Sequence, residues 1–88
     1  MIGSAMSRIR KEREDLAKAN VHIAEGERRV AQQIGLIQWM TKKGHDTEEA
    51  TKLLWNYQTT LETWREHRRL ILQEIARLEG RDPEAPVP

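Results

Sequence analysis

The 88-residue sequence contains no cysteine, which excludes disulfides and thiolate metal sites and fits a reducing compartment. It also contains no phenylalanine, so three tryptophans and one tyrosine supply all the large rings. The 15 basic and 14 acidic residues leave a net charge of +1, so no overall field draws the chain to nucleic acid or to a membrane. No apolar run approaches membrane-span length, and no signal peptide is recognisable. We expect a soluble cytoplasmic protein, bacterial in style.

Proline is scarce, and its three copies all lie within the last six residues. We therefore expect residues 80–88 to form a disordered, proline-rich tail. At the other end, small residues precede a second methionine, Met6, so we expect residues 1–6 to be a disordered extension, for which a vector origin is one explanation. Residues 7–79 remain as the single folded unit.

A short segment in the middle of the chain has the composition of a turn between two helices. Lys42 and Lys43 suit a helix C-terminus, where cations meet the negative end of the helix dipole, and Gly44 supplies the left-handed residue that often closes a helix. Asp46 and Glu49, three residues apart, form a capping-box pattern for the next helix. A turn at residues 44–46 folds the second helix back beside the first, which predicts an antiparallel hairpin.

Heptad spacing predicts how the two helices pack. Between about Arg8 and Lys43 the seam positions are Ile9, Leu16, Ile23, Val30 and Ile37, with Glu12, Ala19, Gly26, Gln33 and Met40 at the companion position. Between about Thr47 and Glu79 they are Ala50, Leu54, Tyr57, Leu61, Trp64, Arg68, Ile71, Ile75 and Leu78. The expected fold class is all-α, with two long helices in an antiparallel coiled-coil hairpin. Gly26 lies on this seam, and folding at the turn puts it near Leu61, Trp64 or Arg68, depending on the register. We expect the Trp64 side chain to cover it.

The sequence carries more large apolar side chains than one hairpin seam can cover. The expected interface residues are Ile34, Leu36, Trp39, Leu53, Trp55, Tyr57, Trp64, Leu70 and Leu72. Surplus apolar groups of this size often mark a partner surface. We expect the hairpin to dimerise into a four-helix bundle, or to dock on the helices of another protein.

Polar residues interrupt the middle of the hairpin, and we expect His22, Gln33, His67 and Arg68 to form a polar layer. One interpretation is a metal or proton-linked site between facing helices. The other, which we favour, is a partly solvated layer that fixes helix register. Neither His22 nor His67 has the glutamate three residues earlier that a di-iron bundle requires, so we expect no metal and no cofactor. Arg68 either pairs with Glu27 or with a carboxylate of a partner chain, or lays its stem along the seam with its guanidinium in water.

Basic runs near residues 8–13, 28–29 and 65–69 raise the alternative of nucleic-acid binding, but acidic residues interrupt them and no reader motif is present. An enzyme is disfavoured because there is no glycine-rich phosphate loop and no nucleophile with a plausible base, so we expect no small-molecule substrate. The expected function is a non-enzymatic helical protein–protein interaction or oligomerisation module. The alternative is a small nucleic-acid-associated regulatory protein.

Several stretches resemble a group of short alphaproteobacterial proteins without an established activity. The resemblance rests on residues 22–33, on the turn at 44–47, and on Ala50, Leu53, Leu54, Thr60, Leu61, His67 and Arg68, and it spans about residues 16–78. It implies a small cytoplasmic helical hairpin, and it draws attention to His22, Gly26, Gln33, His67 and Arg68. The sequence departs from the group at Trp39, Trp55 and Trp64, so a shared partner is not implied.

Overall fold

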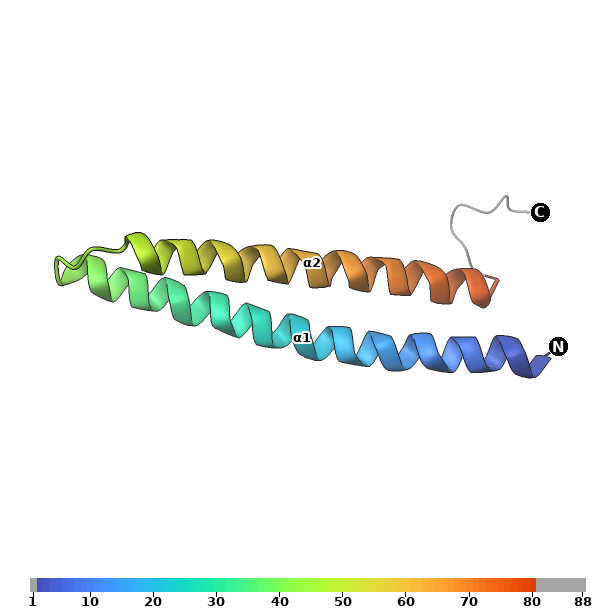
Figure 1. Ribbon diagram of the computed structural model, residues 1–88. Coiled ribbons are helices and arrows are strands. Elements are labelled where there is room, and N and C mark those ends of the chain that lie inside the picture. Colours follow the sequence, from blue (N-terminus) through green and yellow to red (C-terminus); the bar gives the residue numbers. More distant parts are fainter. Residues whose placement is uncertain (1, 81–88) are drawn as a thin grey trace.

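The computed structural model describes residues 2–80, with side chains described from Met6 onward. It confirms the all-α antiparallel hairpin: α1 (Ile2–Lys42) and α2 (Glu48–Leu78) lie side by side, and residues 2–80 contain no strand (Figure 1). The longest dimension is 64 Å, close to the roughly 61 Å expected for a 41-residue helix at 1.5 Å per residue. The radius of gyration is 19.1 Å, whereas a compact domain of this length has about 12 Å. The molecule is therefore a rod with little interior.

The first helix begins earlier than predicted. It starts at Ile2, so residues 2–6 continue the helix and the prediction of a disordered extension over residues 1–6 is wrong for that part. No proline interrupts the segment, and each residue added to an existing helix gains a hydrogen bond, which is why the helix extends through Ser7. Met1 and residues 81–88, where the rest of the extension and most of the tail were expected, lie outside the described residues.

The turn closes α1 as predicted. Gly44 has a φ of +75°, the left-handed conformation, and its N–H donates to the Thr41 carbonyl at 3.1 Å. The N–H of His45 donates to the Met40 carbonyl at 2.9 Å, which completes the hydrogen-bond pattern of a Schellman motif. This motif satisfies the carbonyls that the end of α1 leaves free and directs the chain back toward α2.

The start of α2 departs from the predicted capping box. Asp46 Oδ1 accepts a hydrogen bond from the Glu48 N–H at 3.0 Å, so the aspartate does satisfy a free backbone donor. Glu49 does not reach back to Asp46, because its carboxylate accepts a bond from Lys52 Nζ at 3.3 Å. At the far end, α2 stops at Leu78, and Gly80 has the left-handed φ of +72°.

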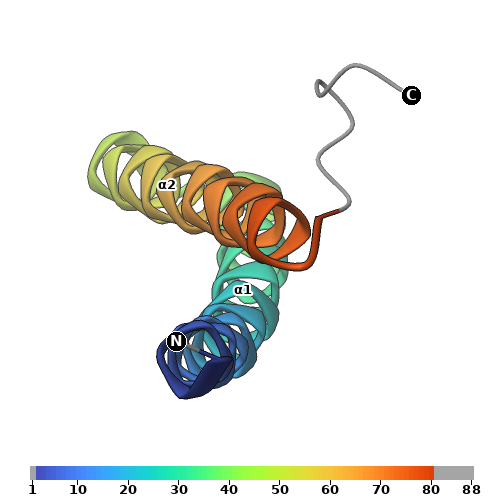
Figure 2. The same ribbon diagram turned by 90° about the vertical axis from the view of Figure 1, so that its right-hand side faces the viewer.

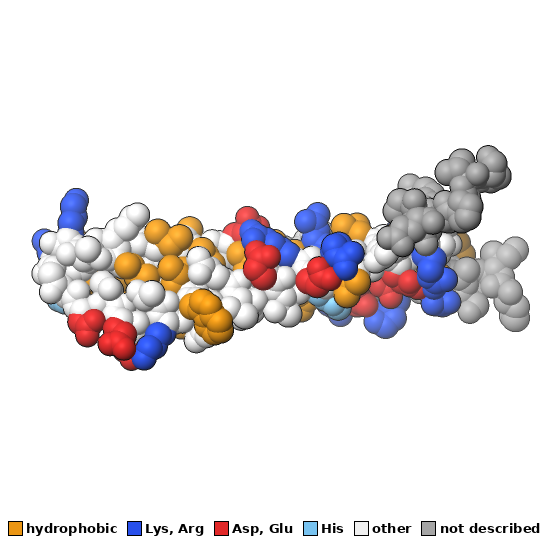
Figure 3. All heavy atoms as spheres, turned by 90° about the horizontal axis from the view of Figure 1, so that it is seen from above, with side chains coloured by type: hydrophobic (Ala, Val, Ile, Leu, Met, Phe, Trp, Pro, Cys, Tyr) orange, Lys and Arg blue, Asp and Glu red, His pale blue; other side chains and the backbone are white. Residues whose placement is uncertain are grey.

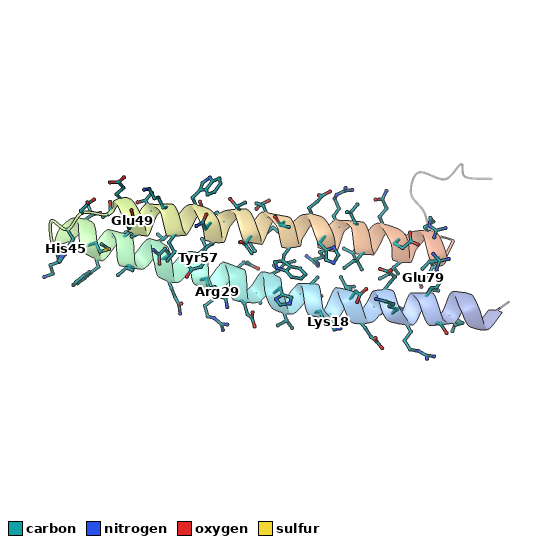
Figure 4. The ribbon with its side chains drawn as sticks, viewed as in Figure 1. Lys18, Arg29, His45, Glu49, Tyr57 and Glu79 are labelled. Carbon is teal, nitrogen blue, oxygen red and sulfur yellow. The ribbon has the colours of Figure 1, made fainter. Side chains whose placement is uncertain are left out.

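The core lies along the predicted seam and is thin. Its buried apolar residues are Ala19, Ile23, Leu61, Ile71 and Ile75. Ala19, Ile71 and Ile75 form a cluster in the half of the hairpin away from the turn, with Leu16 and Trp64 packed against it. Tyr57 is half-buried and points from α2 toward α1 (Figure 4). Every predicted α2 seam residue is buried or half-buried except Arg68, which is exposed.

Leu61, and not Trp64, faces Gly26. A β-carbon placed on Gly26 would lie 3.1 Å from Leu61 Cδ1 and 3.5 Å from Leu61 Cβ. The prediction that Trp64 covers this glycine is therefore wrong, by one step along the α2 seam. A glycine at position 26 still serves close packing of the helices, because the missing side chain lets α2 approach α1 closely there.

The two helices are inclined to each other, as the view along the rod shows (Figure 2). Neither helix, over its described residues, is long and apolar enough to cross a membrane.

Candidate interaction surface

Two ion pairs that join the helices identify the two broad faces of the hairpin. Arg8 Nη2 lies 3.3 Å from Glu74 Oε1, and Arg13 Nη2 lies 3.0 Å from Glu79 Oε2, near the open end where Figure 4 labels Glu79. In a heptad pattern, residues seven apart share a face. Each ion pair therefore marks one side of the seam on both helices.

The face marked by Arg8 and Glu74 carries both central histidines, and we call it the His22 face. In steps of seven it runs through Asp15, His22, Arg29 and Leu36 on α1, and through His67, Thr60 and Leu53 on α2. The opposite face, marked by Arg13 and Glu79, runs through Asn20, Glu27, Ile34 and Thr41 on α1, and through Leu72, Arg65, Gln58 and Thr51 on α2. Trp55 lies one helical turn from both Thr51 and Gln58, so we call this the Trp55 face.

The two histidines of the predicted polar layer lie on either side of Trp64. The His22 ring stacks on the indole with centroids 4.1 Å apart and planes inclined by 15°. The His67 ring meets the same indole edge to face, with centroids 5.5 Å apart and an angle of 72°. Both histidines are exposed, so they cover a half-buried tryptophan from the solvent side and do not form a buried layer.

The surroundings of these histidines contain little to hold a metal. His22 Nδ1 lies 3.9 Å from Glu25 Oε2, an intrahelical approach, and no group of three possible ligands occurs among the described residues. The arrangement supports packing of aromatic rings, which contributes about 0.5–1.5 kcal/mol per pair beyond area burial.

Gln33 and Arg68, the other members of the predicted polar layer, lie in different environments. Gln33 is buried, and its Nε2 donates to the Ala50 carbonyl at 2.8 Å, which links the helices across the seam near the turn. Arg68 is exposed, as the interpretation with its guanidinium in water requires, and it has no ion-pair partner among the described residues. Of the four predicted polar-layer residues, only Gln33 is buried and forms a hydrogen bond across the seam.

Most of the predicted interface residues are exposed. Seven of the nine are large apolar residues with 38% or more of their surface accessible, namely Ile34, Leu36, Trp39, Leu53, Trp55, Leu70 and Leu72. The other two, Tyr57 and Trp64, are half-buried in the seam. Trp55 is 65% exposed, and Trp39 is 51% exposed although its ring stacks on His45 with centroids 5.4 Å apart. Met6 and Val21 are also exposed and were not predicted.

The structure divides these residues between the two faces, a division absent from the prediction. Leu36 and Leu53 belong to the His22 face, with Trp39 one turn from Leu36. Ile34 and Trp55 belong to the Trp55 face. The heptad positions beside the seam assign each residue to one flank of its own helix. A contact between the helices then shows which flank of α1 adjoins which flank of α2, and so which residues share a face.

Charge is sparse along two helix segments next to the turn. Residues 30–41 contain no charged side chain, and residues 50–61 contain only Lys52. We call these two segments the turn-proximal half. The register set by Gly26 and Leu61 places residues 50–61 opposite residues 26–37, and it places Asp46, Glu48 and Glu49 opposite residues 38–41. In Figure 3 the red and blue side chains gather toward the open end, apart from a small cluster beside the turn. A solvent-facing helix normally carries charged residues on its outer surface, so this half is unusual.

In the half of the hairpin away from the turn, which we call the open half, α2 carries three intrahelical ion pairs of arginine with glutamate. Arg65 pairs with Glu62, Arg69 with Glu66, and Arg77 with Glu74. The hydrogen bond from Arg77 lowers the pKa of the Glu74 carboxyl, and the charge of Arg8 adds to this effect.

Similar pairs act elsewhere on the surface of the open half. The hydrogen bond from Arg69 lowers the pKa of Glu66, and the hydrogen bond to Asp15 raises the pKa of Lys11. These groups are exposed, so their pairs stabilise the hairpin weakly.

One hollow lies on the N-terminal part of α1. It has a volume of about 370 Å³ and is lined by Met6, Ile9, Arg10, Arg13, Glu14 and Ala17. Because a single helix forms this lining, it does not surround a small molecule in the way that ligand pockets do. The turn-proximal half is the stronger candidate for a functional site. Comparisons of the chain with protein-family models, with curated proteins and with solved structures find no match.

Proposed function

We propose that the chain is a non-enzymatic helical module for protein–protein interaction, and that it binds through its turn-proximal half. The observation that carries the proposal is the coincidence, in residues 30–41 and 50–61, of exposed large apolar side chains and a single charged residue, Lys52. Interface cores are depleted in charge and enriched in aromatic residues relative to ordinary protein surface. Contiguous exposed apolar patches mark interaction sites more often than scattered single residues do.

The thin core supports the same proposal. No large side chain among those described is fully buried, and the core cluster lies away from the turn. Packing against another helical surface would remove more apolar area from water, at about 25 cal/mol per Å². A four-helix arrangement is the usual way in which two-helix units gain such a core.

The alternative, a nucleic-acid-associated protein, draws less support. The arginines that hold ion pairs to carboxylates are Arg8, Arg13, Arg65, Arg69 and Arg77. Each paired guanidinium must give up a carboxylate before it can neutralise a phosphate. Such a protein would bind duplex DNA or RNA with an affinity that falls steeply as salt is raised.

The proposal is tested with charges placed in the turn-proximal half. The double variant Leu53→Glu/Trp55→Glu alters both broad faces, and Gln73→Glu adds a charge at an exposed site in the open half as the matched control. Self-association is followed by sedimentation, and partner capture by affinity purification from an extract of the encoding organism. We expect wild type to show one of these activities, the control to keep it, and the double variant to lose it. If wild type shows neither, or if the double variant keeps what wild type shows, the proposal is wrong.

A further inference from the structure

We propose that the partner is a second copy of this chain, which docks on the turn-proximal part of the Trp55 face. This inference rests on the proposed function and names its partner. The residues that make the docking surface are Ala31, Ile34, Gln38, Thr51, Trp55 and Gln58, all of them exposed. They come from both helices, so a helix of the partner would lie over each.

Charge favours a second copy over a foreign partner. None of the six residues of this docking surface is charged, so two copies face each other without like-charge repulsion. A charged partner would find no complementary group among these six residues, and it would meet charges only at the border, where Glu27, Glu48 and Lys52 lie.

The register of the hairpin places a large side chain and a small one at the same height on this face. Gly26 lies opposite Leu61, so two residues that are equally many positions closer to the turn, one counted from Gly26 on α1 and the other from Leu61 on α2, lie at the same height along the rod. Trp55, six residues from Leu61, therefore lies level with residue 32, beside Ala31. Trp55 is 65% exposed and is the largest side chain of the face, whereas Ala31 is exposed and small.

These two positions match in one arrangement of the dimer. A two-fold axis parallel to the rod places α2 of one copy over α1 of the other, with both turns at the same end. Trp55 then meets the partner's Ala31, and Ala31 meets the partner's Trp55, the reciprocal contact that a two-fold interface requires. A two-fold axis perpendicular to the rod would instead place the two Trp55 indoles against each other and leave Ala31 uncovered. Two large side chains would then compete for the same space.

The contact area predicts a weak dimer. The 12 residues of each turn-proximal segment give a contact roughly 18 Å long, and two helices roughly 10 Å wide each give about 360 Å² per partner. The total of about 720 Å² lies below the 1,200–2,000 Å² of stable complexes, so we expect a dissociation constant of about micromolar order or weaker. Concentrations from about 5 to 500 µM therefore cover the transition.

Sedimentation velocity of the full chain over this range tests the docking surface. We expect wild type to shift from monomer to dimer, and Trp55→Glu to raise the dissociation constant at least tenfold with unchanged helix content by circular dichroism. Leu53→Glu, which makes the same kind of change in the same half but on the His22 face, should dimerise as wild type does. The inference is overturned if wild type stays monomeric, if Trp55→Glu dimerises like wild type, or if Leu53→Glu loses dimerisation equally. A monomeric wild type whose partner capture is sensitive to Trp55→Glu would overturn this inference alone and leave the proposed function standing.

The arrangement is tested with single cysteines, since the chain has none of its own. Gln38 and Glu48 lie at about the same height on the two helices and at the edge of the Trp55 face. When Gln38→Cys and Glu48→Cys chains are mixed and oxidised, we expect the mixed disulfide to form in preference to either like pair. Preference for a like pair would overturn the proposed axis.

Discussion

The contact between Gly26 and Leu61 gives the sharpest test of the hairpin packing. A methyl group at position 26 would lie 3.1 Å from Leu61 Cδ1, a distance at which the leucine must move by a few tenths of an ångström. The atom in the way is the end of a flexible side chain. Against this small cost, alanine is more favourable than glycine inside a helix by about 1 kcal/mol. We therefore expect Gly26→Ala to change the free energy of unfolding by less than about 1 kcal/mol in either direction.

A larger side chain at the same position should behave differently. Leucine adds atoms that cannot fit against Leu61 without separating the helices, and overpacking of this kind costs about 1–3 kcal/mol. For a domain of this size that lowers the melting temperature by roughly 4–8 °C per kcal/mol. The matched control is Gly35, where an added β-carbon meets nothing within 4 Å. Gly35→Ala should therefore stabilise the protein by the full helix-propensity gain of about 1 kcal/mol.

Thermal melting by circular dichroism, at one fixed protein concentration, measures all three variants. We expect the melting temperature to rise for Gly35→Ala, to change little for Gly26→Ala, and to fall for Gly26→Leu. In addition, Leu61→Ala should reduce the cost of Gly26→Leu, because it removes the atoms that collide. Equal melting of Gly26→Leu and wild type would refute the close approach at this position.

Three further predictions follow from the described contacts. Gln33→Ala should lower the free energy of unfolding by about 0.5–1.5 kcal/mol, because it removes a part-buried hydrogen bond to the Ala50 carbonyl. Gln32→Ala, at an exposed site, should be nearly neutral in urea unfolding, and equal effects of the two changes would show that the bond contributes nothing. His22→Ala uncovers one face of Trp64 and should shift the tryptophan emission to the red, with a loss of about 0.5–1.5 kcal/mol, and an unchanged spectrum would count against the stacking. Folding lowers the pKa of Glu74, so this group contributes stability above the unfolded pKa of 4.5, and the contribution is lost as the pH falls through the folded pKa. Glu74→Gln should therefore flatten the dependence of the melting temperature on pH below about 4.5. An unaltered dependence would contradict a stabilising ion pair at Glu74.

Much of the fold was predictable because it follows from short-range patterns. Heptad spacing identified the seam on both helices, and the composition around Gly44 identified the turn. The choice between Leu61 and Trp64 opposite Gly26 was not predictable, since it depends on the path of the chain through the turn. The hydrogen bond from the His45 N–H to the Met40 carbonyl fixes that path, and a shift of one seam position is smaller than sequence patterns resolve.

The candidate site was predictable in composition and not in arrangement. Surplus apolar residues could be counted from the sequence, and the structure shows that most of them are exposed. Their division between two faces depends on cross-helix contacts such as those of Arg8 and Arg13, whose long side chains could reach several carboxylates. The ring stacking around Trp64 was missed for a similar reason, because it requires both the register and the side-chain directions of His22 and His67.

The central claim, that a second copy of the chain binds the turn-proximal half of the rod, is tested most directly by dilution of the isotope-labelled chain followed by NMR. Between about 500 and 5 µM, a concentration range that spans weak association, we predict shifts at the backbone amides of Ala31, Ile34 and Gln58 and at the indole N–H of Trp55, with the indole N–H of Trp64 unchanged. Spectra that do not change with concentration, or that change mainly in the charged half, would contradict it.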